Sequence, residues 1–222
     1  MNTNSISYIG LDIKHITKPS LKHSYINITQ DSEVVIKTPK VSQEYLFKLI
    51  QNKESWIKKK LNFIKQNPYI KMNLDDEVLF LGELYSIDST EVSDLRLNLE
   101  KIKVGSTDKS IKCYNKFYRD SCIEYVVPRV EYFSNIMGLE YKEIKFRKMK
   151  SRWGSCSSKK TLTFNTELIK IKKELVDYVI VHELAHLKHM NHSKEFHSFV
   201  DRYLPNSYSY RQELKKTRIQ FL

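Results

Sequence analysis

The sequence predicts an α+β protein, with a small β-rich unit at the N-terminus followed by a larger domain organised around one helix. Three observations carry this prediction. Strand-favouring residues dominate positions 24–37, and apolar residues then recur with a mostly helical period up to Pro68. An apolar run at positions 175–181 leads directly into His182 and His186. Short strands and long helices together indicate the α+β class for this chain of 222 residues, which is long enough for two small cores.

The first 105 residues are predicted to form the small α+β unit. Residues 24–37 read as a hairpin, because Gln30–Ser32 interrupts two strand-favouring stretches as a turn would. A second hairpin is expected at 78–87, around Gly82-Glu83. Between the hairpins one helix is expected, whose apolar residues are Leu46, Leu49, Ile50, Trp56, Ile57, Leu61 and Ile64.

The domain boundary is expected at the polar, turn-rich stretch 105–108, which places the second domain at residues 106–222. That domain should begin with a long amphipathic helix over about 114–136, kinked at Pro128 and capped by Gly138. Strands are expected at 141–146 and 161–164, on either side of a loop at 151–158. The second strand, with Asn165, is a candidate to hold an extended substrate by edge pairing.

Composition narrows the class of protein. Lys and Arg number 38 against 26 Asp and Glu, a net charge of +12 that favours polyanions, although a solvated surface explains it more simply. The three cysteines, Cys113, Cys122 and Cys156, form neither an even disulfide set nor a C-x-x-C pair, so reduced thiols are expected. The first 14 residues lack a leader pattern, and no stretch has the apolar length of a membrane span, so a cytoplasmic protein without membrane contact is expected.

Residues 182–186 form the motif H-E-x-x-H. Four residues at about 100° each bring His182 and His186 onto one helix face, one turn apart, where two imidazoles can share a metal ion. Glu183 projects to a neighbouring position and is the candidate general base. A helix with incidental polar residues would have to bury two unpaired histidines and a glutamate, which costs free energy, so a metal site is the better interpretation.

A catalytic zinc needs three protein ligands and an open position, so a third ligand must come from elsewhere. His192 is the preferred candidate, because Asn191 before it can adopt a left-handed conformation that turns the chain back. His189 ranks second as the third ligand. Three side chains in a row along one straight helix would lie nearly in one plane and could not occupy three corners of a tetrahedron. Glu195 is a minor alternative for the third ligand, and His197 is interpreted as a surface or packing residue. The spacing to His192 is that of metzincins, but their turn glycine and Met-turn are absent.

The sequence resembles the YgjP-like metallopeptidases, distant relatives of the SprT-like and WLM peptidases. Weaker similarity, through Trp56-Ile57, Gly82 and Tyr85, extends over most of the chain. The specific matches are Lys150–Cys156, Asn165, Leu168-Ile169, Tyr178–Leu187, Asn191–Ser193 and Phe196.

This resemblance implies a zincin-like metallopeptidase domain in which His182, His186 and His192 hold Zn²⁺ and Glu183 is catalytic. The substrate would then be a peptide or protein. His197 departs from the family, which commonly has tryptophan after the phenylalanine. In the matching segment, Trp153 is expected in the core, Cys156 is expected to be a buried inert thiol, and Arg152 is a candidate to hold an oxyanion or a substrate carboxylate.

Two other functions remain open from sequence alone. A zinc hydrolase of a nucleotide would keep the same site, but the chain has no Gly-rich phosphate loop. A nucleic-acid-binding protein with a secondary zinc site is suggested by basic residues, although such runs are usually solvated faces. These basic residues are Lys58–Lys60, Lys142, Lys145, Arg147, Lys148, Lys150 and Arg152.

Overall fold

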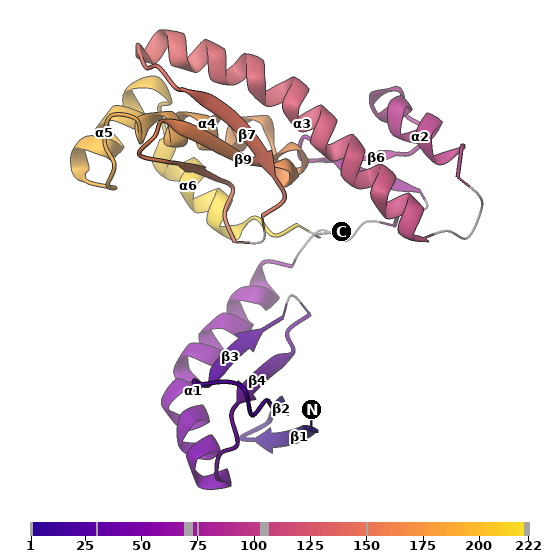
Figure 1. Ribbon diagram of the computed structural model, residues 1–222, viewed down its shortest axis with the longest axis vertical. Coiled ribbons are helices and arrows are strands. Elements are labelled where there is room, and N and C mark those ends of the chain that lie inside the picture. Colours follow the sequence, from indigo (N-terminus) through magenta and orange to yellow (C-terminus); the bar gives the residue numbers. More distant parts are fainter. Residues whose placement is uncertain are drawn as a thin grey trace. The chain divides into compact units, whose positions relative to one another are not determined.

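The computed structural model describes residues 2–29, 31–68, 73–74, 76–102, 107–149 and 151–219 (Figure 1). It confirms the α+β class and divides the chain into two compact units, Met1–Tyr69 and Ile70–Leu222. No described helix combines the length and the apolar character needed to cross a membrane.

The first unit is a four-stranded sheet with one helix along it. Strands β1 (Asn2–Tyr8), β2 (Leu11–Thr17), β3 (Tyr25–Ile28) and β4 (Val34–Thr38) lie in the order β1-β2-β4-β3. Pairing is antiparallel except between β2 and β4, which are parallel. Helix α1 (Gln43–Gln66) begins after Ser42, whose side chain caps it by accepting from the Tyr45 N–H.

The hairpin expected at 24–37 is β3–β4, and the expected helix is α1. Ile13, Ile36, Ile50 and Ile57 are fully buried between sheet and helix. Strands β1 and β2 were not anticipated, because β1 is mostly polar and shows no alternation of apolar residues. They pair through a tight turn at Ile9-Gly10, where both residues have a positive φ.

The second unit begins with the expected hairpin at 78–87, formed by β5 (Glu77–Phe80) and β6 (Glu83–Ser86). A short helical segment, η1 (Thr90–Val92) followed by α2 (Ser93–Leu99), leads to the long helix α3 (Thr107–Met137). Helix α3 continues through Pro128 and ends at Gly138, whose positive φ of 63° provides the expected cap.

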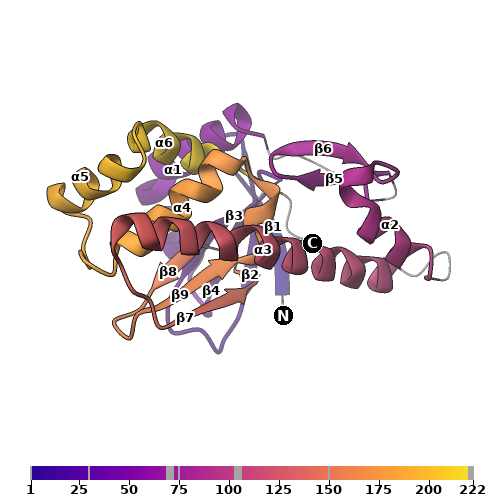
Figure 2. The same ribbon diagram turned by 90° about the horizontal axis from the view of Figure 1, so that it is seen from above.

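The site-bearing part combines a small sheet with four helices. Strands β7 (Glu143–Arg147), β9 (Thr161–Asn165) and β8 (Gly154–Cys156) lie in that spatial order, with β7 parallel and β8 antiparallel to β9. The 3-10 segment η2 (Thr166–Lys170) then leads to α4 (Lys173–Ala185), α5 (Lys194–Tyr203) and α6 (Ser207–Lys216). Helices α3 and α4 lie on the same side of this sheet, with α6 beyond α4 (Figure 2).

Two expectations need revision here. Strand β9 is the central strand, so the described edges of the sheet are β7 and β8, and edge pairing at 161–165 is not available. The boundary expected at 105–108 lies partly outside the described part of the chain and partly in the first turn of α3, whereas the structure divides between 69 and 70. The reason is packing, because Leu79, Val92 and Leu95 are fully buried in the same core cluster as α3 and α4.

Candidate metal centre and active site

Helix α4 provides the candidate site residues His182 and Glu183, and His186 is the C-cap residue that follows its last turn. Its preceding turns are almost entirely buried, with Val176 and Ile180 fully inaccessible to solvent. Asp177 on the same helix accepts two hydrogen bonds from the Arg129 guanidinium of α3, at 2.8 and 2.6 Å. This bidentate ion pair and the apolar packing fix α4 in place, which in turn fixes the site residues.

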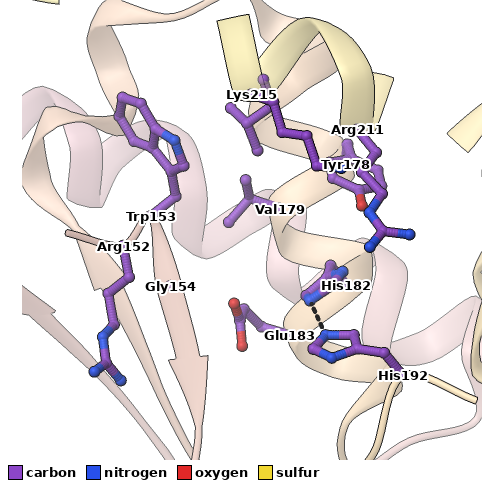
Figure 3. A pocket seen from close by; sticks show the side chains of 11 residues that line it. Arg152, Trp153, Gly154, Tyr178, Val179, His182, Glu183, His192, Arg211 and Lys215 are labelled. Carbon is purple, nitrogen blue, oxygen red and sulfur yellow. Dashed lines mark hydrogen bonds between the residues drawn. The ribbon is translucent and has the colours of Figure 1, made fainter. Parts of the chain in front are cut away.

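The rings of His182, His186 and His192 converge on one point. Each offers one ring nitrogen, and these three atoms lie within 4.8 Å of one another. The Nε2 atoms of His182 and His192 are 3.0 Å apart, as the dashed line in Figure 3 shows. Zinc–nitrogen bonds of about 2.0–2.1 Å in a tetrahedral site place the ligand atoms at about this spacing, so the three residues fit a zinc ion.

The protonation state of the histidines also suits a metal. Burial, followed by the charges of His186 and His192, lowers the pKa of His182 to about 3. Burial likewise lowers the pKa values of His186 and His192 from their ordinary value. All three imidazoles are therefore neutral near pH 7, and neutral imidazole is the form that binds metal ions.

The backbone orients one of the three rings. The Nδ1–H of His186 donates to the carbonyl oxygen of His189 at 3.0 Å, which leaves Nε2 of His186 free for a ligand. The ring of His189 itself packs on Phe199, with ring centroids 5.5 Å apart, outside the cluster. The structure thus brings His192, and not His189, to the pair on α4. Glu195 and His197 are also outside the cluster.

The chain returns to the site through a compact turn. Helix α4 ends at Ala185, and successive turns at 187–189 bond back to Leu184 and Ala185 before Ser193 caps α5. Asn191 does not have the positive φ that was expected of it. The turn is instead set from α5, where fully buried Phe196 packs 4.7–4.9 Å from all three histidine rings, measured between ring centroids.

Glu183 is enclosed beside the triad. Its side chain is only 6% exposed, and burial raises its pKa to about 8, while the nearby Arg152 guanidinium opposes that rise. The backbone of β8 passes directly over it. A Cβ placed on Gly154 would lie 2.7 Å from both Cγ and Oε1 of Glu183, so only glycine fits this approach. This contact was not foreseen from the sequence.

A single amide holds the loop that carries Gly154. Asn165, which is 1% exposed, donates from Nδ2 to the carbonyl oxygens of Met149 and Arg152 at 2.7 and 2.9 Å. Its Oδ1 accepts from the N–H groups of Met149 and Glu167, both at 3.2 Å. All four hydrogen-bonding positions of the amide are therefore used, which fixes the loop relative to β9.

A cavity of about 370 Å³ opens beside these residues (Figure 3). Trp153, expected in the core, is partly buried there and also forms part of the cavity wall. Cys156, expected to be buried, is only half-buried and is not part of the wall; burial raises the pKa of its thiol to about 11, which agrees with an inert side chain. The cavity is lined by Arg152, Trp153, Gly154, Tyr178, Val179, His182, Glu183, His192, Arg211, Leu214 and Lys215.

Helix α6 contributes residues that sequence reasoning missed, namely Arg211, Leu214 and Lys215. They follow His192 by 19 to 23 residues, in a polar segment without a recognisable pattern. Their spacing of i, i+3 and i+4 places them on one helix face, but which face meets the site depends on how α6 packs on α4.

Comparison with known proteins identifies the family. The family model described as YgjP-like, metallopeptidase domain, matches residues 22–217. Among solved structures, the chain is similar to a metallopeptidase zymogen, abylysin of Pyrococcus abyssi, with 22% identity, 43% of this chain and 99% of that chain covered, and a TM-score of 0.38. It is also similar to the zymogen of jannalysin from Methanocaldococcus jannaschii, with 29% identity, 40% and 91% coverage, and a TM-score of 0.36. No curated protein matches the sequence. The chain belongs to the YgjP-like family, and the metallopeptidase domain that defines the match makes it a metal-dependent peptidase.

Proposed function

We propose that this protein hydrolyses peptide bonds with a zinc ion held by His182, His186 and His192, and that Glu183 is the general base. The observation that carries the proposal is the convergence of three neutral imidazoles within 4.8 Å, beside a carboxyl group that shares their cavity. The Nδ1 atom of His182 is buried without a hydrogen-bond partner among the described residues. Its ring is therefore held by packing against its neighbours.

The three histidines supply neutral nitrogen ligands and leave one side of the cluster open to the cavity. A zinc ion bound there would lower the pKa of water toward about 7 and polarise a peptide carbonyl. Glu183 lies on the cavity side of α4, where its carboxylate accepts the proton of the attacking water. The same carboxyl group then delivers this proton to the leaving amine.

The raised pKa of Glu183 suits this shuttle. In the protein without metal, burial holds the carboxyl group protonated at neutral pH. A nearby cation stabilises the carboxylate and lowers that pKa toward the working pH, where a base both accepts and returns a proton efficiently. Gly154 limits where the carboxyl group can move, because the β8 backbone lies against it.

Part of the basic segments is engaged in contacts within the protein, and the family match to a metallopeptidase domain is the reason to propose a peptide substrate. Several of their residues are already paired, since Lys58 contacts Glu54 at 2.6 Å and Lys145 contacts Glu143 at 2.7 Å. Lys148 donates to Asn115 at 2.7 Å, and Lys150 lies outside the described residues. We therefore retain a peptide or protein as the proposed substrate.

The decisive variant is Glu183→Gln, which keeps the shape of the side chain but cannot accept a proton. We expect wild-type zinc content and a loss of hydrolysis on the order of 10²- to 10⁴-fold, as is typical of general acid–base groups. Metal analysis and cleavage of a denatured protein substrate measure both properties. Glu174→Gln, an exposed glutamate in the first turn of the same helix, is the matched control and should retain activity. Wild-type cleavage by Glu183→Gln would show that the general base lies elsewhere.

A further inference from the structure

The cavity beside the histidine triad has an unusual balance of charge. Three cationic side chains line it, Arg152, Arg211 and Lys215, whereas Glu183 is the only acidic group of the lining. Among the residues that the structure describes, none of the three cations forms an ion pair with a carboxylate. Cationic side chains therefore outnumber acidic ones in the described lining, and no described carboxylate forms an ion pair with the two cations of α6, Arg211 and Lys215.

Arg211 has the strongest connection to the metal centre. It is half-buried on α6, and Figure 3 shows its guanidinium group directed toward His182 and His192. Its Nη1 donates to Nε2 of His197 at 3.3 Å. Because this acceptor is a neutral ring nitrogen, the hydrogen bond orients the guanidinium group but leaves its charge uncompensated. Among the described residues, most of its five N–H donors have no other partner and can reach a ligand.

The remaining wall is apolar. Trp153 and Val179 face the cavity from the loop before β8 and from α4 (Figure 3). Leu214 of α6 also lines it. Arg152 lies across Glu183 from the histidines in Figure 3, so it belongs to the other end of the cavity. A ligand group that enters on the α6 side would thus meet an apolar wall with a cationic edge. Such partly dehydrated surroundings strengthen a pairing between opposite charges.

We infer that the α6 side of this cavity is a substrate subsite that binds a carboxylate, with Arg211 as its principal ligand and Lys215 as a second cation. The carboxylate belongs either to an aspartate or glutamate side chain near the scissile bond, or to the free C-terminus of a peptide. A planar guanidinium group can bind either carboxylate with two parallel hydrogen bonds. This inference rests on the proposed peptidase function, since it assigns the substrate class of the same site.

His197 acquires a specific role in this subsite, that of a positioning residue. It stands one position after Phe196, which packs on the triad, and its ring stacks on His192 with ring centroids 6.2 Å apart. From there its Nε2 accepts from Arg211. A tryptophan at this position would have no acceptor nitrogen and could not orient the guanidinium group in the same way.

Two sets of matched peptides test the inference on the zinc-loaded protein. The first set places glutamate or glutamine at each position around a cleavage site, and the second compares a free C-terminal acid with its amide. We expect the wild-type kcat/KM to favour one acidic form by about 10- to 100-fold, as is typical of a hydrogen-bonded charge, mainly through KM. The set that shows the preference identifies the source of the carboxylate.

Variants then assign the preference to residues. Arg211→Gln should abolish the discrimination between acid and amide, and Lys215→Gln should reduce it. Lys216→Gln is the matched control on the same helix, because Lys216 does not line the cavity, and Arg202→Gln on α5 controls for loss of an arginine charge. His197→Trp should weaken the discrimination while leaving zinc content unchanged. His197→Gln, which retains an acceptor, should restore part of it.

A binding measurement makes the test independent of turnover. In a Glu183→Gln background with Trp56→Phe, Trp153 is the single tryptophan, since the chain has two, and it lines the cavity. Its fluorescence should report tighter binding of the acidic peptide than of its amide partner. Adding Arg211→Gln should make the two dissociation constants equal.

The outcomes separate the two hypotheses. Cleavage without any preference between acid and amide, together with equal binding, would reject the subsite and leave the peptidase function intact. Preferential binding of acidic peptides through Arg211, with no cleavage by zinc-loaded wild-type protein, would reject the peptidase proposal and retain the subsite. If Arg211→Gln lowered kcat equally for both peptides with unchanged binding, Arg211 would stabilise the oxyanion instead, and the inference would be overturned.

Discussion

At the scale of single residues, His192 is distinguished from His189 by where its ring lies. His192 joins the cluster through its ring, whereas His189 contributes only its backbone carbonyl, which orients His186. Both histidines are close in sequence to the motif. From the sequence, only helix geometry could rank them as candidates for the third metal ligand. The structure adds the buried Phe196, which packs under the triad and directs the returning chain.

The first prediction separates these two histidines by metal content. His192→Ala should lose zinc during mild dialysis, because it removes one of three proposed ligands. His189→Ala should keep about one zinc per chain, since alanine retains the carbonyl oxygen that accepts from His186. Elemental analysis of both dialysed variants provides the measurement. Loss of zinc from His189→Ala with retention in His192→Ala would move the third ligand to His189.

A second prediction concerns the stability of the metal-free protein as a function of pH. Burial raises the pKa of Glu183 in the folded state to about 8 from its ordinary value of 4.5, so the folded state binds an extra proton between those values. The free energy of unfolding should therefore fall as pH rises through this window. Below about 6.5 the lowered pKa values of His182, His186 and His192 act in the opposite direction.

The window from about pH 6.5 to 8 thus isolates Glu183 among these four groups. Denaturant unfolding of the chelated protein at several pH values should show stability declining there, and Glu183→Gln should remove that decline. Each unit of pKa shift corresponds to about 1.4 kcal/mol, so the difference is measurable. If the free energy of unfolding changed with pH in the same way in wild type and variant, the Glu183 carboxyl group would be ionised at neutral pH without metal.

At the scale of elements, the site depends on the close approach of β8 to α4. Strand β8 is short and consists of Gly154, Ser155 and Cys156, residues with little preference for a strand. Its conformation follows from pairing with β9 and from the hydrogen bonds of Asn165 to the preceding loop. The absence of a side chain at Gly154 then allows the strand to cover Glu183.

Gly154→Ala should therefore impair catalysis without removing the metal ligands. The added methyl group would lie 2.7 Å from the Glu183 side chain, which must shift away from its enclosed position. We expect normal zinc content, a loss of kcat/KM of at least about 10-fold and a lower melting temperature. Ser155→Ala, the next residue of the same strand, is the control. Full activity of Gly154→Ala would show that the position of the Glu183 carboxyl group tolerates displacement.

Helices and strands with a strong periodic pattern of apolar residues could be predicted from the sequence. Strands that form only because a neighbouring strand pairs with them could not. Helix α1, the two expected hairpins, the long helix α3 and strand β9 all follow from local patterns of apolar and turn residues. Strand β1 is polar and β8 has three residues, so only pairing reveals them. In the same way the motif at 182–186 indicated the metal-binding helix, while Arg211 becomes visible only through the packing of α6 on α4.

At the scale of the whole molecule, each unit has a core of its own. The core of the first unit is centred on Ile13, Ile36 and Ile50, and it shares no residue with the core around α3 and α4. Residues 77–99 belong to the second core, although they resemble the first unit in their short strands and turns. Burial, and not the polar composition of the connecting segment, decides which unit a segment belongs to.

Two fragments distinguish the boundary at 69/70 from the one expected at 105/106. Residues 70–222 should fold and bind about one zinc, because the second core and all three histidines are included. Residues 106–222 should be unstable, since they lack the fully buried Leu79, Val92 and Leu95. Burying each such side chain contributes about 1.5–3 kcal/mol to the free energy of folding. Circular dichroism and metal content test both fragments, and a stable 106–222 would support the later boundary.

The different exposure of the three histidines has a consequence for how long a metal ion stays bound. His182 and His186 lie on a helix fixed in the core, whereas His192 is exposed and lies on the turn between α4 and α5. Turns open locally at a lower free-energy cost than packed helices do. A metal ion held by the three proposed ligands would therefore leave His192 first, and chelators would gain access from that side while α4 stays folded. We expect this turn to set the lifetime of the bound ion and the core to set its position.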